Sequence, residues 1–165
     1  MPQPLLCGRK IAALILEKNE RTVQRWCDDG TLKFAGLDAR NRAMVNVEDV
    51  LELCGKLRFA DHEIAELISR ADQDSAEAQN DLGITLLKEG QHLAAFSLFG
   101  ASAAQNYSDA MHWLYHCHQK GMGTVQDENM AMMWLNKAAA HGHKIAKIQV
   151  DAIRALATER LKNGY

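Results

Sequence analysis

Histidines gathered in the last third of the chain are the side chains whose type and spacing could do chemistry. Of the seven histidines, five lie at positions 112, 116, 118, 141 and 143, and Cys117 stands among them. His112 and His116 are one helical turn apart, a spacing that can ligate zinc. The pair lacks the internal glutamate that serves as the general base of zinc hydrolases. Histidines on a helix are more often packed or solvated than bound to a metal ion. We therefore expect no metal site and no cofactor.

No other segment carries a catalytic signature. The glycine-rich segment Gly121-Met122-Gly123 has no strand before it and no Lys-Ser or Lys-Thr after it, so it is not a phosphate-binding loop. Nucleophile elbows and kinase motifs are also missing from the sequence. We therefore expect a protein that is not an enzyme. The opposing hypothesis is a metal-dependent hydrolase. It would require bound zinc that is lost on His112→Ala.

The composition is typical of a helical globular protein. The chain has 165 residues, of which 47% are hydrophobic and 24% charged. This length allows one medium domain or two small ones. Its two prolines are Pro2 and Pro4, so residues 5–165 contain none. Because proline is the strongest helix breaker, this distribution favours uninterrupted helices.

The cysteines and the apolar segments indicate a reducing compartment. Cys7, Cys27, Cys54 and Cys117 are widely spaced and form no Cys-x-x-Cys pair, which argues against a zinc ribbon and a disulfide framework. No segment approaches the roughly 18 apolar residues of a membrane span, and the N-terminus has no legible signal peptide. We expect a cytoplasmic protein with no membrane partner.

The first part of the chain has the pattern of a helix-turn-helix. Ile11, Leu14 and Ile15 recur at helical spacing, and Asn19 is a good N-cap for a helix over residues 20–28. On that helix Val23, Trp26 and Cys27 share one face, which we expect to be buried, while the opposite face is polar and partly cationic. Such a face suits phosphates and base edges.

A two-stranded wing follows in the predicted order. Residues 33–37 and 43–47 favour two short strands around the polar turn 38–41. Asn46 is the expected N-cap of a third helix, with Asp49 in its first turn. Arginines at the turn would lie against the DNA backbone or in the minor groove.

These segments resemble the excisionase and MerR-like winged-helix family. The residues that carry the resemblance are Arg21–Leu32, Arg40-Asn41-Arg42 and Val47-Glu48-Asp49-Val50. The resemblance implies binding of double-stranded DNA, with α-helical residues in the major groove and arginines on the wing. The expected DNA-binding residues are Arg21, Thr22, Gln24, Arg25, Lys33, Arg40 and Arg42. The alternative is a winged-helix fold that serves protein contacts, since folds are shared more widely than functions.

The charge distribution agrees with nucleic-acid contact at one end only. Residues 1–60 contain ten Lys and Arg against eight Asp and Glu, and residues 61–165 contain nine against thirteen. The first segment is therefore slightly basic and the second acidic. Asp61 is the expected N-cap of a connecting helix, and the polar stretch 69–75 is expected to be a short ordered connector.

The rest of the chain repeats itself. Ala78-x-x-x-Leu82 recurs as Ala110-x-x-x-Leu114 and as Ala146-x-x-x-Val150, at spacings of 32 and 36 residues. Small residues at fixed places in such a period predict stacked helix pairs. The segments 76–83, 120–127 and 131–143 resemble Sel-one-like repeats, relatives of the tetratricopeptide repeat. That resemblance implies an α-solenoid that binds an unidentified protein.

The last helix is expected to run from Lys144 to about Asn163. Its apolar side chains could cap the repeat stack, as terminal repeats require, or pair with another copy of the chain; they are Ile145, Val150, Ile153, Leu156 and Leu161. We favour capping. No heptad pattern follows the first 60 residues, so the oligomeric state stays open and a homodimer is one possibility.

The prediction as a whole is a mainly α protein in three parts. Residues 1–60 form a winged helix-turn-helix, residues 61–75 a connecting helix and linker, and residues 76–165 about two helix-pair repeats with a capping helix. The function expected is that of a DNA-binding transcriptional regulator or accessory factor whose tail binds a protein. The alternative is a protein–protein adaptor that does not bind DNA.

Overall fold

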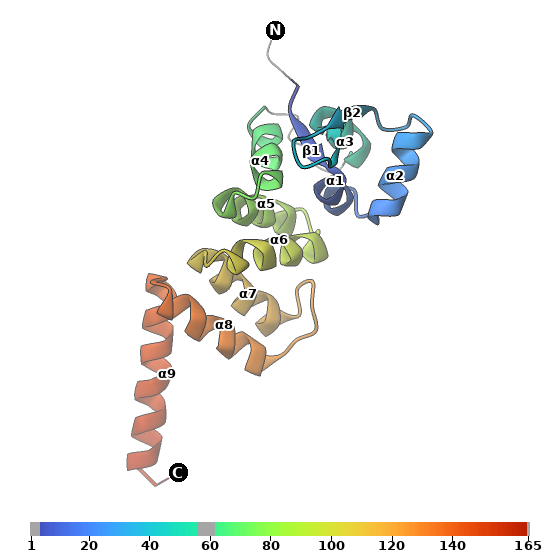
Figure 1. The fold of residues 1–165 in the computed structure, drawn as a ribbon. Coiled ribbons are helices and arrows are strands. Elements are labelled where there is room, and N and C mark those ends of the chain that lie inside the picture. Colours follow the sequence, from blue (N-terminus) through green and yellow to red (C-terminus); the bar gives the residue numbers. More distant parts are fainter. Residues whose placement is uncertain (1–3, 56–61, 165) are drawn as a thin grey trace.

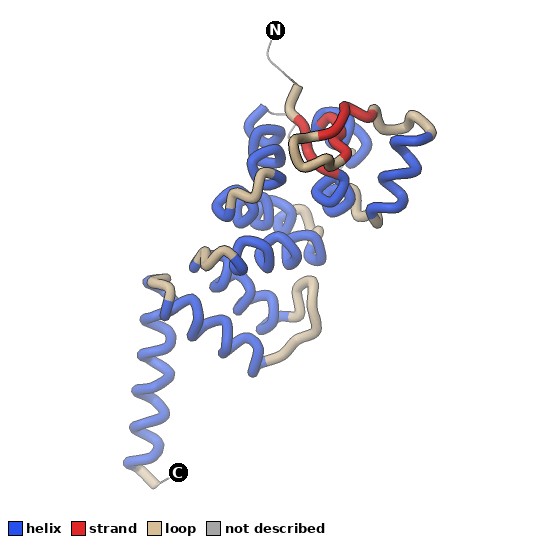
Figure 2. The backbone as a smooth tube through the Cα atoms, in the orientation of Figure 1, coloured by secondary structure: helices blue, strands red, loops and turns tan. Residues whose placement is uncertain are grey.

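The structure is a computed structural model that describes residues 4–55 and 62–164. Figure 1 shows a small mixed head, a connecting helix and a stack of helices that follow one another in chain order. The architecture is mainly helical, as predicted. Strands occur in the described residues only in the head, where Figure 2 shows them gathered in one sheet.

The head contains the elements that the sequence predicts, and one more. Its elements are β1 (Leu6–Gly8), α1 (Arg9–Ile15), α2 (Glu20–Asp28), β2 (Phe34–Leu37), β3 (Ala43–Asn46) and α3 (Val47–Cys54). Strand β1 pairs antiparallel with β3, so the sheet has the order β1-β3-β2. The two strands expected of the wing, β2 and β3, pair antiparallel as predicted, and β1 is an additional strand that the sequence did not predict. The three residues of β1 are too few to show an alternating pattern, and only their pairing with β3 makes them a strand.

The caps of α2 and α3 are those that the sequence predicts. The side chain of Asn19 accepts a hydrogen bond from the backbone N–H of Thr22 at 2.8 Å, and that of Asn46 accepts one from Glu48 at 3.0 Å. Val23 of α2 is buried, and Trp26 of the same helix is partly exposed and packs against the core. The inward face of α2 is thus confirmed.

The connection between head and repeats is mostly helix. Helix α4 spans His62–Asp72, so the expected connector 69–75 is shorter than predicted: only Gln73, Asp74 and Ser75 lie between α4 and the next helix. Ser75 caps that helix through the N–H of Ala78. The predicted N-cap Asp61 lies outside the described residues.

The repeats consist of antiparallel helix pairs with a close approach inside the first pair. Their helices are α5 (Ala76–Lys88), α6 (His92–Ala104), α7 (Ser108–Lys120), α8 (Glu128–Ala140) and α9 (Lys144–Lys162). Gly83 of α5 faces the ring of Phe99 on α6, and a Cβ at Gly83 would lie 2.7 Å from that ring. Phe99 in turn stacks on Trp113 of α7, with ring centroids 5.6 Å apart. Gly83 therefore sets how closely the helices stack.

The loop between α7 and α8 is the glycine-rich segment of the sequence. Gly123 has a φ of 72°, and a Cβ there would lie 2.2 Å from the carbonyl oxygen of His92 on α6. No other residue type fits this conformation and this approach together. Asp127 then caps α8 through the N–H of Met130.

Head and repeats share one hydrophobic core, which runs from Cys7 in β1 to Val150 in α9. At their junction the buried amide of Gln91, between α5 and α6, donates a hydrogen bond to the carbonyl of Ile15 at the end of α1, at 3.2 Å. The junction is thus closed by both apolar packing and a buried polar contact. The division of the chain into residues 1–60, 61–75 and 76–165 stays a prediction from the sequence.

Helix α9 caps the stack with its first half only. Ala146 and Val150 are buried, whereas every described residue from 151 onward is exposed. Figure 2 shows the helix extending away from the stack. The capping expected of Ile145, Ile153, Leu156 and Leu161 was wrong, because the repeats end before the helix does. Over the described residues, no helix is long and apolar enough to cross a membrane.

We predict that Gly83→Ala lowers the free energy of unfolding by about 1–3 kcal/mol, because the new methyl group must displace the buried ring of Phe99. Gly100→Ala is the matched control: Gly100 also lies in a helix, but a Cβ there meets nothing within 4 Å. It should raise the free energy of unfolding by about 0.5–1 kcal/mol. Chemical denaturation measures both, and equal effects would contradict the packing described.

Candidate interaction surfaces

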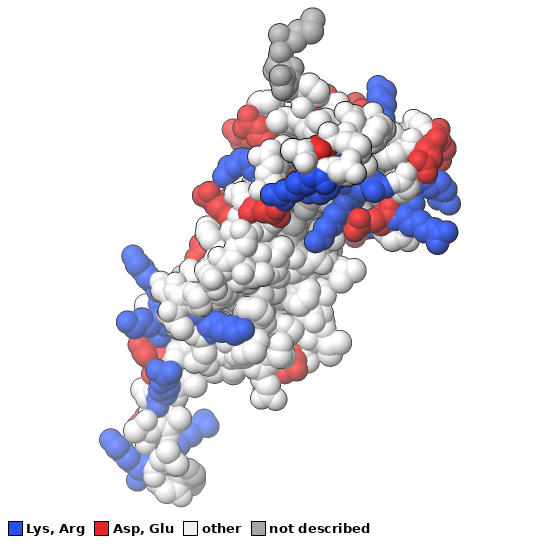
Figure 3. Space-filling view, viewed as in Figure 1, with Lys and Arg blue, Asp and Glu red and all other residues white. Residues whose placement is uncertain are grey.

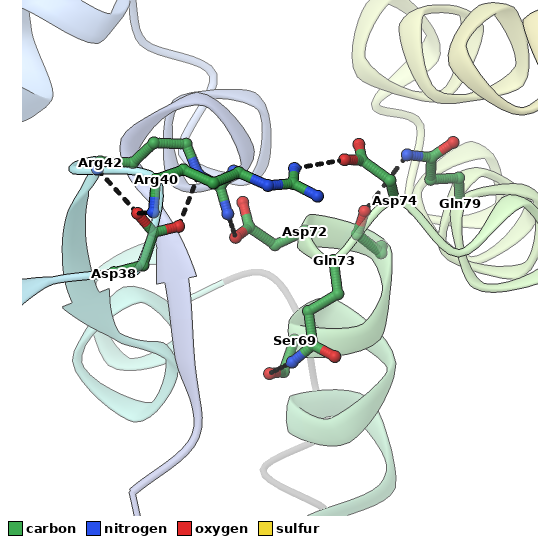
Figure 4. A network of polar contacts seen from close by, with 9 residues as sticks. Asp38, Arg40, Arg42, Ser69, Asp72, Gln73, Asp74 and Gln79 are labelled. Atoms are coloured by element: carbon green, nitrogen blue, oxygen red, sulfur yellow. Dashed lines mark hydrogen bonds and ion pairs between the residues drawn. The ribbon is translucent and has the colours of Figure 1, made fainter.

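The wing arginine Arg42 is held between two carboxylates. Its Nε lies 2.7 Å from Oδ2 of Asp38 in the wing turn, and its Nη2 lies 3.1 Å from Oδ2 of Asp72 at the end of α4. The side chain of Asp72 is only 3% exposed, whereas that of Arg42 is 38% exposed. Figure 4 shows Arg42 reaching from the sheet toward both acids. A residue expected to contact DNA thus neutralises a buried carboxylate.

Arg40, the second wing arginine, makes a weaker contact with the same region. Its Nη1 lies 2.8 Å from Oδ2 of Asp74, but both side chains are more than half exposed. Exposed pairs of this kind contribute roughly 0–1 kcal/mol. Figure 4 shows that Arg40 also points toward the α4–α5 turn.

Asp38 organises the turn that presents these arginines. Its carboxylate accepts hydrogen bonds from the backbone N–H groups of Arg40 and Arg42, at 3.0 and 2.7 Å. The N–H of Arg42 is the largest cause that lowers the pKa of Asp38. The hydrogen bond to Asp38 is likewise the largest cause that raises the pKa of Arg42. Both groups therefore stay ionised at neutral pH.

Asp72 lies against the backbone of β1. A Cβ at Gly8 would come within 2.9 Å of its Oδ1, so only glycine leaves room for the carboxylate. The neighbouring thiol of Cys7 has a raised pKa, first because it is buried and second because Asp72 is near. Cys7 is therefore an inert core thiol. The contact of Arg42, Asp72 and Gly8 joins wing, connecting helix and β1.

The other predicted DNA-binding residues lie apart from this contact. Arg21 and Arg25 are exposed on the outer face of α2, with Thr22 and Gln24 partly exposed between them. Asp28 is on the same face, and the amide of Gln24 donates a hydrogen bond to it at 2.7 Å. Lys33 is exposed before β2. The structure thus brings together the four residues of α2, but pairs the two wing arginines with the α4–α5 region.

A cleft of about 370 Å³ lies between the two groups. One side is formed by the turn from α1 to α2, and the other by the wing and the repeats; the lining residues include Lys18, Asn19, Glu20, Arg42, Asp72, Asp74 and Ser97. This space is far smaller than a DNA duplex. Residues of α1, of the wing and of α5 and α6 therefore line one cleft.

Three of the histidines meet at the junction of α7 and α9. The ring centroid of His112 is 4.2 Å from that of His143 and 4.7 Å from that of His116. His112 donates from Nε2 to the side-chain oxygen of Gln149 at 3.0 Å. His143 caps α9, because its Nδ1 accepts the N–H of Ala146 at 3.0 Å. The cluster thus fastens α9 to α7.

Two imidazoles of this cluster, those of His112 and His116, have lowered pKa values and are neutral at neutral pH. Burial is the largest cause that lowers the pKa of His112, and the nearby His143 adds to it. Burial also lowers the pKa of His116, with the neighbouring His112 as the next cause. Over the described residues, no group of three His, Cys, Asp or Glu side chains is placed to hold a metal ion.

The sequence grouped His118 and Cys117 with these histidines, but they lie on the opposite side of α7. His118 is buried edge-on against Phe96, at a centroid distance of 5.5 Å. Burial raises the pKa of Cys117 to about 11, so its thiol stays protonated. Both are core residues, because their positions on the helix turn them toward α6.

The outward side of α7 and the start of α9 form one surface, which we call the α7–α9 face. It consists of His112, Tyr115, His116, Gln119, His143 and Gln149. The amide of Gln119 donates to the hydroxyl of Tyr115 at 2.9 Å, and the ring of Tyr115 lies beside those of His112 and His116. Tyr115 and Gln119 were missed in the sequence, although they fall at helical spacing from His112.

Charged side chains are concentrated away from the middle of the repeats. Figure 3 shows them over the head and along α9, while the intervening surface is almost free of them in this view. Helix α6 contains no Lys, Arg, Asp or Glu. Depletion of charge is typical of the centre of protein interfaces.

Comparison with known proteins identifies the repeats. The model of the Sel1 repeat family matches residues 76–115 and 116–143, which cover α5 to α8. The crystal structure of a Sel1 repeat protein from Oxalobacter formigenes is similar in fold, with a TM-score of 0.51 and 21% sequence identity. That similarity covers 66% of this chain and only 39% of the other protein. No curated protein matches the chain. The Sel-one-like repeats predicted from the sequence are thus confirmed, and the winged-helix resemblance of the head stays a prediction.

We predict that Arg42→Ala lowers the free energy of unfolding by about 1–3 kcal/mol, because Asp72 is then a buried carboxylate without its cation. Arg40→Ala is the control: it removes an equally charged wing residue from an exposed pair and should change stability by at most about 0.5 kcal/mol. Urea denaturation of the full chain measures both. A loss for Arg40→Ala as large as that for Arg42→Ala would contradict the role given to Asp72.

Proposed function

We propose that the chain is a protein-binding adaptor, in which the α7–α9 face contacts the partner and the head is a fixed part of the scaffold. Sel1 repeats indicate protein–protein interaction, and they span residues 76–143. The observation that carries the choice of surface is the partly exposed cluster of His112, Tyr115 and His116 on α7.

The α7–α9 face has the properties of a binding hot spot. Tyr115 and the histidines have large rings that stay partly exposed, and ring contacts and hydrogen bonds already hold them in place. Side chains that are ordered before binding lose little conformational entropy on binding. Neutral imidazoles also present hydrogen-bonding groups without the cost of burying a charge. These features support a protein partner at this surface.

The docked wing supports the adaptor hypothesis for the head. Arg42 neutralises a carboxylate that is almost fully buried, so withdrawing it to bind a phosphate would leave Asp72 without a cation. Residues of α5 and α6 line the cleft beside the wing. The head therefore extends the solenoid at its N-terminal end.

The test is partner capture with surface variants of the full chain. Tyr115→Ala should lower the amount of a specifically captured protein at least tenfold, as expected when an interface loses an aromatic residue worth about 1.4 kcal/mol or more. Leu93→Ala is the matched control, since Leu93 is a highly exposed apolar residue on α6. Quantitative mass spectrometry of the captured proteins measures both.

The comparison of the two variants decides where the partner binds. Retention of the partner by Tyr115→Ala and its loss with Leu93→Ala would place binding on α6 and contradict the α7–α9 face. Circular dichroism of each variant shows that the helices are intact.

A second candidate function is DNA binding through α2. It is favoured by the outer face of that helix, where a hollow of about 380 Å³ is lined by Asn19, Arg21, Thr22, Gln24, Arg25 and Asp28. These side chains could contact phosphates and base edges without the wing. Asp28 weakens the case, because it places a negative charge on the same surface.

We predict for this candidate that the full chain binds a generic duplex with an affinity that falls steeply as salt rises. Arg25→Ala should weaken binding and make the salt dependence shallower by about one phosphate contact. Arg42→Ala should change the affinity little, because its guanidinium is engaged by Asp38 and Asp72. Fluorescence anisotropy at several salt concentrations measures this, and negligible binding at low salt would leave only the adaptor.

A further inference from the structure

The docking of α9 on the repeats depends on few contacts. Two of the 19 residues of this helix are buried, Ala146 and Val150. Neither side chain is large, so together they bury little apolar surface. Two polar contacts supplement them: the ring of His143 caps the helix, and His112 of α7 is hydrogen-bonded to Gln149. The attachment of α9 to α7 therefore depends on the state of imidazole rings.

The cap of α9 requires a neutral imidazole. The Nδ1 atom of His143 accepts the backbone N–H of Ala146 at 3.0 Å, so it must carry a lone pair and no proton. Protonation would turn Nδ1 into a donor that faces another donor. It would also place a positive charge at the N-terminus of a helix, where the helix dipole is itself positive. A charged His143 therefore loses the cap.

The histidines also lie close enough to repel one another once they are charged. The ring centroid of His112 is 4.2 Å from that of His143 and 4.7 Å from that of His116. His112 and His116 belong to α7, whereas His143 is the N-cap of α9. Positive charge on both sides of the junction would thus push the two helices apart. Burial opposes that charge as well, and it is the largest cause that lowers the pKa of His112 and of His116.

The other charges around the cluster do little to offset this repulsion. Oδ1 of Asp109 on α7 lies 3.7 Å from Nε2 of His143, which favours an imidazolium there, but the carboxylate is 55% exposed and its effect is weakened by water. The remaining charged groups on the adjoining turns are exposed and mostly cationic: Lys120 on α7, Lys137 on α8, and Lys144, Lys147 and Asp151 on α9. Lys120 adds to the lowering of the pKa of His116.

We propose that acidification detaches α9 from α7, because the docked helix requires His112, His116 and His143 to be neutral. Histidines of a detached helix titrate near pH ~6.5. The docked form disfavours the added protons, so the stabilisation that docking provides is complete above that pH. It decreases as the pH falls through the lower pKa values of His112 and His116. This inference concerns the chain alone and does not depend on the proposed partner.

The experiment measures amide hydrogen exchange of the full chain, corrected for the intrinsic effect of pH on exchange. A helix of this length is only marginally stable in water by itself, so a detached α9 should lose protection. We expect the amides of residues 147–150 to exchange at least tenfold faster at about pH 5 than at about pH 7.5. The amides of α5, which contains no histidine, are the internal control and should keep their protection.

The first variant removes the titrating groups of α7. His112→Gln combined with His116→Gln keeps polar side chains that cannot be protonated, and most of the acid-induced loss of protection should disappear. His141→Gln is the matched control, since His141 is an exposed histidine in the turn before α9. It should lose protection over the same pH range as the unaltered chain. An equal loss in the double variant, or none with His141→Gln, would overturn the assignment to the cluster.

A second variant tests the cap and keeps the proposal testable if the double variant does not dock α9 at any pH. His143→Asn retains an N-cap residue that does not titrate, so α9 should stay protected to a lower pH than in the unaltered chain. Loss of protection at the same pH as in the unaltered chain would contradict the role of His143. Protection of residues 147–150 that stays constant in the unaltered chain from about pH 7.5 to about pH 5 would overturn the whole proposal.

Discussion

The structure depends most on a single buried carboxylate. Asp72 ends α4, lies against Gly8 of β1 and is nearly inaccessible to water. A carboxylate in such a place requires a cation, and Arg42 of the wing supplies it. Because one residue of the pair belongs to the head and the other to the helix that leads into the repeats, their contact fixes how the two parts are oriented. The buried amide of Gln91 reinforces the same junction.

This contact also changes what the wing can do. In a winged helix that grips DNA, the arginines of the wing face outward to meet phosphates. Here Arg42 faces the molecule's own connecting helix, and Arg40 points toward the same region. Arg21 and Arg25 on α2 remain exposed, but without the wing they would form a small contact. A scaffold that holds two parts rigidly explains the position of Arg42 directly, whereas a DNA-reading head requires it to leave a buried partner.

Features set by short stretches of sequence could be predicted, and features set by distant residues could not. The caps at Asn19 and Asn46 depend on spacings of a few residues, and the repeat helices recur with a period visible in the chain, so the sequence indicated both. Strand β1 exists only through its pairing with β3, and Arg42 is 30 residues from Asp72, so neither leaves a local pattern. His112 and His116 were singled out by their spacing, but their meeting with His143 depends on how α9 docks.

The docking of α9 on the repeats is another feature that could not be predicted from the sequence. An apolar helix at the end of a solenoid has a side for the preceding pair and a side for a following one. The sequence indicates that α9 is apolar on several sides. It does not indicate how far the preceding helices extend along α9. In the structure they reach only as far as Val150. The large apolar side chains beyond that point, Ile153, Leu156 and Leu161, therefore stay exposed.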